Sequence, residues 1–133
     1  MKIQTNLVYP LALLTQVEDY SKWVPGILKS EKLSQRSETR KLIYMESEMP
    51  WPFYKRELYL CSSTTFINSD RKGVVIMLRS TNLERMNLWG FDIPKENPYR
   101  AVRADMVKGI MFLEYIDDNS CMLSGMVNIN PKF

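Results

Sequence analysis

Short turns divide the sequence after residue 26 into strand-like runs, and this pattern limits the fold more than any other feature. The runs are expected at 27–36, 40–49, 54–68, 73–81, 100–116 and 120–130. Many of their residues are β-branched or aromatic, and turns such as Asp-Asp-Asn-Ser at 117–120 separate them. We therefore predict about five or six mostly antiparallel strands. One face of such a sheet is solvated, and the other face needs an apolar cover.

Two connections are less regular than these turns. Met-Pro-Trp-Pro-Phe at 49–53 has two prolines, each of which lacks an N–H group and holds the preceding residue extended. Two such prolines cannot lie within a central strand, so this segment predicts a stiff aromatic corner between two strands. Residues 82–100 are expected to form an irregular connection, and Gly109 to mark a bulge or bend in the following strand.

One or two helices are expected before the strands, with the N-terminal helix over residues 10–22. Apolar residues recur there at helical spacing, at Leu11, Leu14 and Val17. Pro10 suits a first helical turn, and Val-Pro-Gly at 24–26 ends the pattern. One helix is barely enough to cover the predicted sheet. Either a second helix or another protein chain is therefore expected on the sheet face.

The composition weighs against an enzyme. None of the 133 residues is histidine, the usual general base near neutral pH and the commonest metal ligand. The sequence contains no glycine-rich phosphate loop, and no CxxC pair for zinc. The net charge of +3 comes from dispersed basic residues, which does not indicate a nucleic-acid-binding surface. We therefore expect no catalytic residues, no metal and no cofactor.

The cysteines and the hydropathy pattern suggest a compartment. Cys61 and Cys121 lie in separate strand-like runs, and we favour two buried thiols over a disulfide. The sequence has no apolar run of the roughly 18–20 residues that span a membrane. Residues 1–16 lack the apolar core and cleavage site of a secretory signal. An intracellular protein is expected, either cytoplasmic or in an organelle such as the mitochondrion.

Alternation along the strands predicts a mixed inner face. The more apolar sides of the runs contain Met45, Leu58, Leu60, Ile76, Leu78 and Leu123, interrupted by Arg56, Ser62, Thr64 and Ser80. A polar group on an apolar face costs about 1–3 kcal/mol unless it is paired. Aliphatic walls with a few polar groups are typical of a ligand cavity. The alternative is that Arg56 lies at a sheet edge and pairs with a carboxylate.

Five segments resemble the START domains, the lipid-transfer members of the helix-grip, or Bet v 1-like, superfamily. They are 20–26, 41–60, 74–81, 99–116 and 126–133, in the order and spacing of that family. The most specific is KLIYMESEMPWPFYKRELYL at 41–60. It resembles the family's strand, Pro-aromatic-Pro corner, Arg-acid pair and next strand.

The resemblance implies a single START-like lipid-binding domain over residues 1–133. The implied fold class is α+β: a helix-grip with a curved antiparallel sheet and an N-terminal helix. The implied function is non-catalytic binding and transfer of a phospholipid or sterol in a hydrophobic cavity, with exchange at a membrane surface. The expected cavity wall is Met45, Leu58, Leu60, Ile76, Leu78 and Leu123. Arg56 is expected to meet a phosphate or hydroxyl group of the lipid, because guanidinium bonds phosphate oxygens in pairs.

The sequence departs from the family in two places. The family usually has Arg-Asp after the corner, and this chain has Arg56-Glu57. The family's long C-terminal lid helix, which closes the cavity, has no counterpart before Phe133. Two expectations follow from the missing helix. Either the sequence is a domain truncated at its C-terminus, or it is a START-like structural or interaction subunit whose open sheet face is covered by a protein partner.

Overall fold

The structure is a computed structural model that describes residues 1–80 and 94–132. Its elements are β1 (Lys2–Ile3), α1 (Val8–Thr15), the 3₁₀ helix η1 (Val17–Lys22), β2 (Ile27–Ser37), β3 (Arg40–Ser47), β4 (Arg56–Asn68), β5 (Lys72–Ser80), β6 (Val102–Arg103), β7 (Asp105–Asp117) and β8 (Ser120–Asn130). Five of the predicted strands are confirmed to within two residues at each end. The run predicted as one strand over 100–116 is divided into β6 and β7, because β6 pairs with β4 and not with the strands that flank β7. The short β1 was not predicted. Of the expected 82–100 connection, residues 82–93 lie outside the described part.

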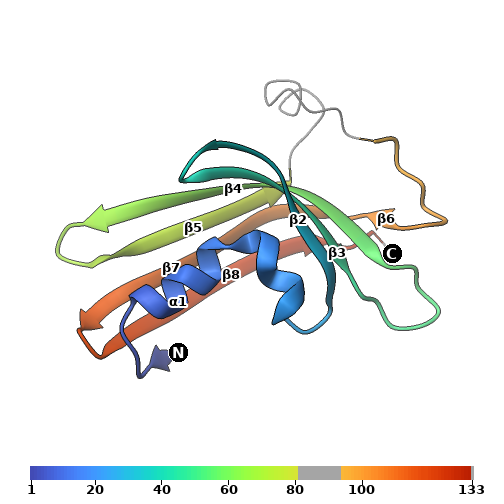
Figure 1. Ribbon diagram of the computed structural model, residues 1–133. Coiled ribbons are helices and arrows are strands. Elements are labelled where there is room, and N and C mark those ends of the chain that lie inside the picture. The colour runs from blue at the N-terminus through green and yellow to red at the C-terminus, as the bar shows by residue number, and fades with distance from the viewer. Residues whose placement is uncertain (81–93, 133) are drawn as a thin grey trace.

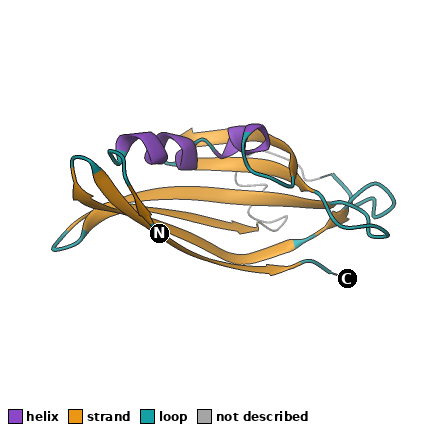
Figure 2. Cartoon of the chain, turned by 90° about the horizontal axis from the view of Figure 1, so that it is seen from below, coloured by secondary structure: helices purple, strands orange, loops and turns teal. Residues whose placement is uncertain are grey.

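The described strands form one curved sheet in the order β1-β8-β7-β5-β4-β3-β2 (Figure 1). Neighbours in this order are antiparallel, whereas the short β6 pairs in parallel with β4. Both helices lie against the same side of the sheet (Figure 2). We call this side the inner face and the opposite side the outer face. The predicted α+β, helix-grip class is confirmed.

The expected helix over 10–22 is two helices in the structure. The side-chain oxygen of Asn6 accepts a hydrogen bond from the Val8 N–H group at 3.0 Å and satisfies one free donor at the start of α1. Gln16 leaves the helical conformation, and η1 then continues in a new direction. The Tyr20 hydroxyl donates to the Leu14 carbonyl at 2.6 Å and ties η1 back to the end of α1. Neither described helix is long and apolar enough to cross a membrane.

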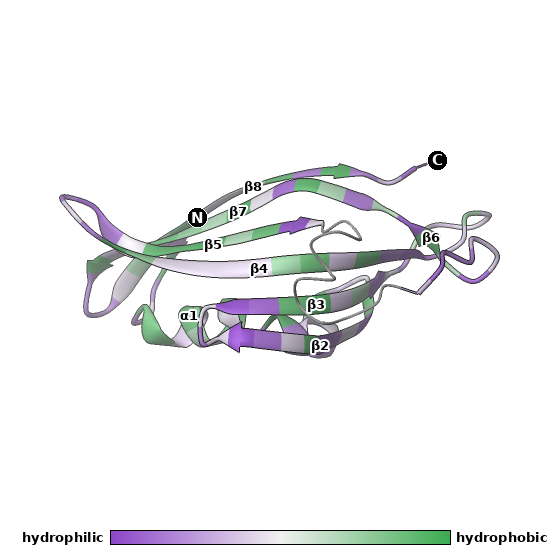
Figure 3. Ribbon diagram, turned by 90° about the horizontal axis from the view of Figure 1, so that it is seen from above, coloured by the Kyte–Doolittle hydropathy of each residue, from purple (hydrophilic) through white to green (hydrophobic). Residues whose placement is uncertain are grey.

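The inner face carries two hydrophobic clusters, consistent with the alternation of hydropathy along the strands (Figure 3). The first cluster is Val17, Tyr20, Ile43, Met45, Leu58, Leu60, Leu78, Ala104 and Met106. The second cluster is Leu14, Val74, Ile76, Leu113 and Cys121. Burial of apolar surface between the helices and the sheet provides most of the stabilisation.

A third cluster, Leu42, Tyr44 and Tyr59, lies on the outer face. Cys61 packs against it, while Cys121 belongs to the second cluster on the inner face. The two thiols are therefore on opposite sides of the sheet, and both are free. Cys121 is buried as expected, whereas Cys61 is only half-buried. The irregularity in β7 falls between Met106 and Lys108, slightly before the predicted Gly109.

Candidate ligand-binding site

An apolar pocket of about 260 Å³ lies at one end of the inner face. We call it the inner pocket. Its lining residues are Ser47, Met49, Arg56, Leu58, Ala104, Ile129 and Pro131. They come from the end of β3, the start of β4, the residue after β6, the end of β8 and the residues that follow it. The pocket is thus built where the proline corner, β6 and the end of β8 meet.

Arg56 is the charged residue of the inner pocket, and its side chain is almost fully buried at 4% exposure. Its Nε donates to the Pro131 carbonyl, and its Nη1 donates to the Tyr54 carbonyl. Its Nη2 donates to the Lys132 carbonyl at 3.4 Å. The guanidinium therefore joins the start of β4 to the residues after β8.

The structure divides the other predicted wall residues between three places. Leu58 lines the inner pocket and also belongs to the first cluster. Met45, Leu60 and Leu78 belong to the first cluster, beneath Val17 and Tyr20 of η1. Ile76 lies in the second cluster, and the half-buried Leu123 packs against it. The structure therefore brings Arg56 and Leu58 together in a pocket and packs the other five beneath the helices. Their contact with a ligand stays a prediction.

Met49, Ala104 and Ile129 are pocket residues that were not among the predicted wall residues. The alternation along the strands already placed two of them, Met49 and Ile129, on the same side as apolar inner-face residues. Ala104 gave no signal, because its place depends on the pairing of β6 with the start of β4. Ile129 is 41% exposed, and Val127, on the same side of β8, is 60% exposed. An open apolar strip thus continues from the inner pocket along β8.

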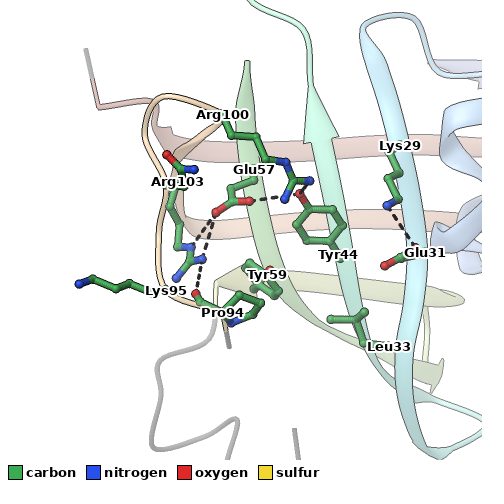
Figure 4. Close-up of a pocket in the computed structure, with 11 residues that line it drawn as sticks. Lys29, Glu31, Leu33, Tyr44, Glu57, Tyr59, Pro94, Lys95, Arg100 and Arg103 are labelled. Carbon is green, nitrogen blue, oxygen red and sulfur yellow. Dashed lines mark hydrogen bonds and ion pairs between the residues drawn. The ribbon is translucent and has the colours of Figure 1, made fainter. Parts of the chain in front are cut away.

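A second group of polar residues lies on the outer face, around two buried carboxylates. The Tyr44 hydroxyl is 2.6 Å from Glu46 Oε1 and 3.1 Å from Glu57 Oε2. Arg100 donates to Glu46 at 2.8 Å. Arg103 donates to Glu57 at 3.0 Å (Figure 4). Sequence reasoning missed this group, because the arginines are more than 40 residues away along the chain.

The charge states of this group follow from its contacts. Burial opposes ionisation of Glu46, but hydrogen bonds from Tyr44 and Lys55 and the charges of Lys55 and Arg100 outweigh it. The pKa of the Glu46 carboxyl is therefore below its ordinary value. Burial, and then the hydrogen bond to Glu46, raise the pKa of Tyr44, so its hydroxyl stays a neutral donor. The group is a charged network that fastens residues 100–103 to β3 and β4.

The sequence matches no protein-family model, and no curated protein matches it significantly. Solved structures do match its fold. Human STARD10 superposes with a TM-score of 0.81 at 15% identity, over 99% of this chain and 50% of that chain. The human StarD13 (DLC2) lipid transfer and protein localization domain superposes with a TM-score of 0.77 at 9% identity, over 100% of this chain and 61% of that chain. This chain has the START fold.

A bacterial structure agrees with this result. The STAR-related lipid transfer protein from Xanthomonas axonopodis superposes with a TM-score of 0.69 at 13% identity, over 98% of this chain and 65% of that chain. This chain therefore spans about half to two thirds of the length of these three protein chains. In this START fold the inner pocket lies on the sheet face that the helices share, and the charged network lies on the other face.

Proposed function

We propose that this chain binds a lipid, a phospholipid or a sterol, at the inner pocket and transfers it without chemical change. The observation that carries the proposal is an apolar pocket with a buried guanidinium in its wall, open onto the apolar strip of β8. The START fold, shared with lipid-transfer proteins, supports the same class of ligand. Arg56 would hold the polar head group, as predicted. Burial of the lipid's apolar part gains about 0.8 kcal/mol per CH₂ group.

The size of the inner pocket limits how the lipid lies. Pockets that enclose small molecules are usually about 300–1,000 Å³, somewhat more than the 260 Å³ found here. A lipid would therefore place only part of its length in the pocket. The rest would extend over Val127 and Ile129, whose exposed side chains supply apolar surface beyond the pocket.

Replacing Ile129 by aspartate should weaken lipid binding by about tenfold or more, because a carboxylate would lose hydration beside the apolar part of the lipid. Ile129 is partly exposed, so the variant should still fold. Met126→Asp is the matched control, since Met126 is 58% exposed on the same strand but faces the other side of the sheet. Native mass spectrometry after incubation with a mixed lipid extract measures the bound fraction. If both variants lost lipid binding equally, the lipid would not lie along the inner-face side of β8.

The proline corner beside the inner pocket is a candidate membrane-contacting tip. Trp51 is 91% exposed there, and Phe53 and Tyr54 are about half exposed. Tryptophan and tyrosine favour the interface between lipid head groups and acyl chains. Because Ser47, Met49 and Arg56 flank this corner and line the pocket, a membrane at the tip would meet the pocket directly. We infer that lipid exchange takes place with the corner on a membrane.

Trp51→Ala should reduce co-sedimentation of the protein with phosphatidylcholine vesicles several-fold, by removing the most exposed aromatic ring of the tip. Phe66→Ala is the control, because Phe66 is 67% exposed near the opposite end of β4. Native mass spectrometry should show that Trp51→Ala still retains bound lipid. If Phe66→Ala reduced sedimentation as strongly, the corner would have no special role.

A different class of function, an interaction subunit, also has one observation in its favour. A protein partner would cover the exposed Val127 and Ile129 as well as a lipid would. The same mass measurement separates the two functions. A monomer with the added mass of one lipid supports a carrier, and a chain that stays bare in the lipid extract supports a subunit.

A further inference from the structure

The outer face has a pocket of its own, of about 220 Å³, which we call the outer pocket. Tyr44 and Tyr59 contribute to its wall from β3 and β4, and Lys29 contributes from β2. Lys95, Arg100 and Arg103 contribute from the segment that crosses back to the sheet before β7 (Figure 4). The sheet therefore separates the outer pocket from the inner pocket.

The crossing segment is held in place by backbone and side-chain bonds. The Val102 N–H group donates to the Lys55 carbonyl at 2.9 Å, and the Ala104 N–H group donates to the Glu57 carbonyl at 2.9 Å. Arg103 Nη2 donates both to Glu57 and to the Pro94 carbonyl, the latter at 2.7 Å. These bonds fix the wall of the outer pocket against the sheet, so the pocket is largely preformed.

Two tyrosine rings, each almost fully buried, form part of the wall of the outer pocket, and a cation lies over each of them. The Tyr44 and Tyr59 rings are 5.0 Å apart between centroids. The Arg103 guanidinium lies over the Tyr59 ring at 4.8 Å, and the Lys29 ammonium lies over the Tyr44 ring at 5.6 Å. The cations bring positive charge close to the rings. The apolar surface that a ligand can reach comes from the exposed parts of Tyr44 and Tyr59 together with Leu33 and Pro94.

The charges that line the outer pocket favour an anion. Four lining residues are basic and only two, Glu31 and Glu57, are acidic. Glu57 is neutralised by Arg103 at 3.0 Å, and Glu31 is 3.7 Å from Lys29. Arg100 is paired with Glu46 behind the lining. Lys95 has no hydrogen bond or ion pair with the described residues, so its charge is available to a ligand.

We propose that the outer pocket binds a small organic anion with a flat apolar body, of the aromatic phosphate or aromatic carboxylate class. The ring would pack against Leu33, Pro94 and the exposed parts of Tyr44 and Tyr59. The anionic group would lie near Lys95, where it would gain a charge-assisted hydrogen bond. This second site shares no lining residue with the inner pocket.

Phenyl phosphate is a suitable probe, titrated into the ¹⁵N-labelled full chain and followed by amide chemical shifts. Saturable shifts are expected at Tyr44, Tyr59 and Arg103. Inorganic phosphate and phenol should each bind at least about tenfold more weakly, because each lacks one of the two contacts. Equal binding of inorganic phosphate would refute the aromatic part of the proposal. Shifts centred on Leu58 and Ile129 would place the probe in the inner pocket and overturn the proposal.

Lys95→Glu provides the second test. This exchange should weaken phenyl phosphate binding by about tenfold or more, since it replaces the available cation by a carboxylate. Lys72→Glu makes the same change in net charge at an exposed position on β5, outside the outer pocket, and should leave the affinity unchanged. Equal weakening by both variants would show attraction to the net charge alone. Absence of saturable shifts in the unmodified protein would also overturn the proposal.

Discussion

Replacing Arg103 by methionine should lower the free energy of unfolding by about 3–5 kcal/mol, the usual cost of leaving a buried charge without its partner. The Glu57 side chain is only 7% exposed, and Arg103 supplies both a cation and two hydrogen bonds to its Oε1. The remaining bond, from the Tyr44 hydroxyl at 3.1 Å, is shared with Glu46. Methionine keeps an apolar side chain of similar length, while the guanidinium over Tyr59 and its bond to the Pro94 carbonyl are lost together with the ion pair.

Urea unfolding measures this effect, and two variants control it. Arg100→Met should change the stability little, because the Arg100 side chain is 60% exposed and Glu46 keeps Lys55 and Tyr44 as partners. Adding Glu57→Gln to Arg103→Met should recover part of the loss, since the unpaired carboxylate is then removed. If Arg100→Met proved as costly as Arg103→Met, burial of Glu57 would not be the source.

The second large effect is expected at Leu60. Its side chain is fully buried on the inner face, in the first cluster with Val17 and Tyr20. Leu60→Ala should therefore cost about 2–5 kcal/mol, from the lost apolar contact and the cavity left behind. Leu28→Ala is the matched control, because Leu28 is 52% exposed on β2 and should change the stability by less than about 1 kcal/mol.

The stability of Leu60→Ala also shows whether Leu60 packs in the hydrophobic core or lines a ligand cavity. A residue that lines an open ligand cavity already lacks neighbours on one side, so its truncation removes fewer contacts. A loss as small as that of Leu28→Ala would therefore favour the sequence-based prediction that Leu60 faces a ligand. A loss in the expected range, unchanged by added lipid, would support packing beneath η1.

The strands were predictable from the sequence because their signals are local. Alternation and turn residues lie within a few positions of one another, and β3 to β5 and β8 follow the expected runs closely. The division of the helix at Gln16 was not predictable in this way. It depends on η1 packing against β2 and β3, a contact that the helical pattern alone does not contain.

The candidate site was predictable only in part, because parity gives the face of a residue and not its position under the helices. Leu60 and Leu58 share a face, yet only Leu58 reaches the inner pocket. The Glu57–Arg103 ion pair could not be predicted from the sequence for a different reason. It joins residues 46 positions apart through a parallel two-residue pairing, and no local pattern encodes that register.

The two-residue strand β6 has a further consequence for communication across the sheet. Arg103 lines the outer pocket, and the next residue, Ala104, lines the inner pocket. The same holds on the facing strand, where Glu57 and Leu58 belong to opposite pockets. The peptide unit between Arg103 and Ala104, at the end of β6, and the one between Glu57 and Leu58, in β4, are thus common boundaries of both sites. Any ligand that displaces β6 on one side would alter the volume on the other, and such linkage is reciprocal by thermodynamic necessity.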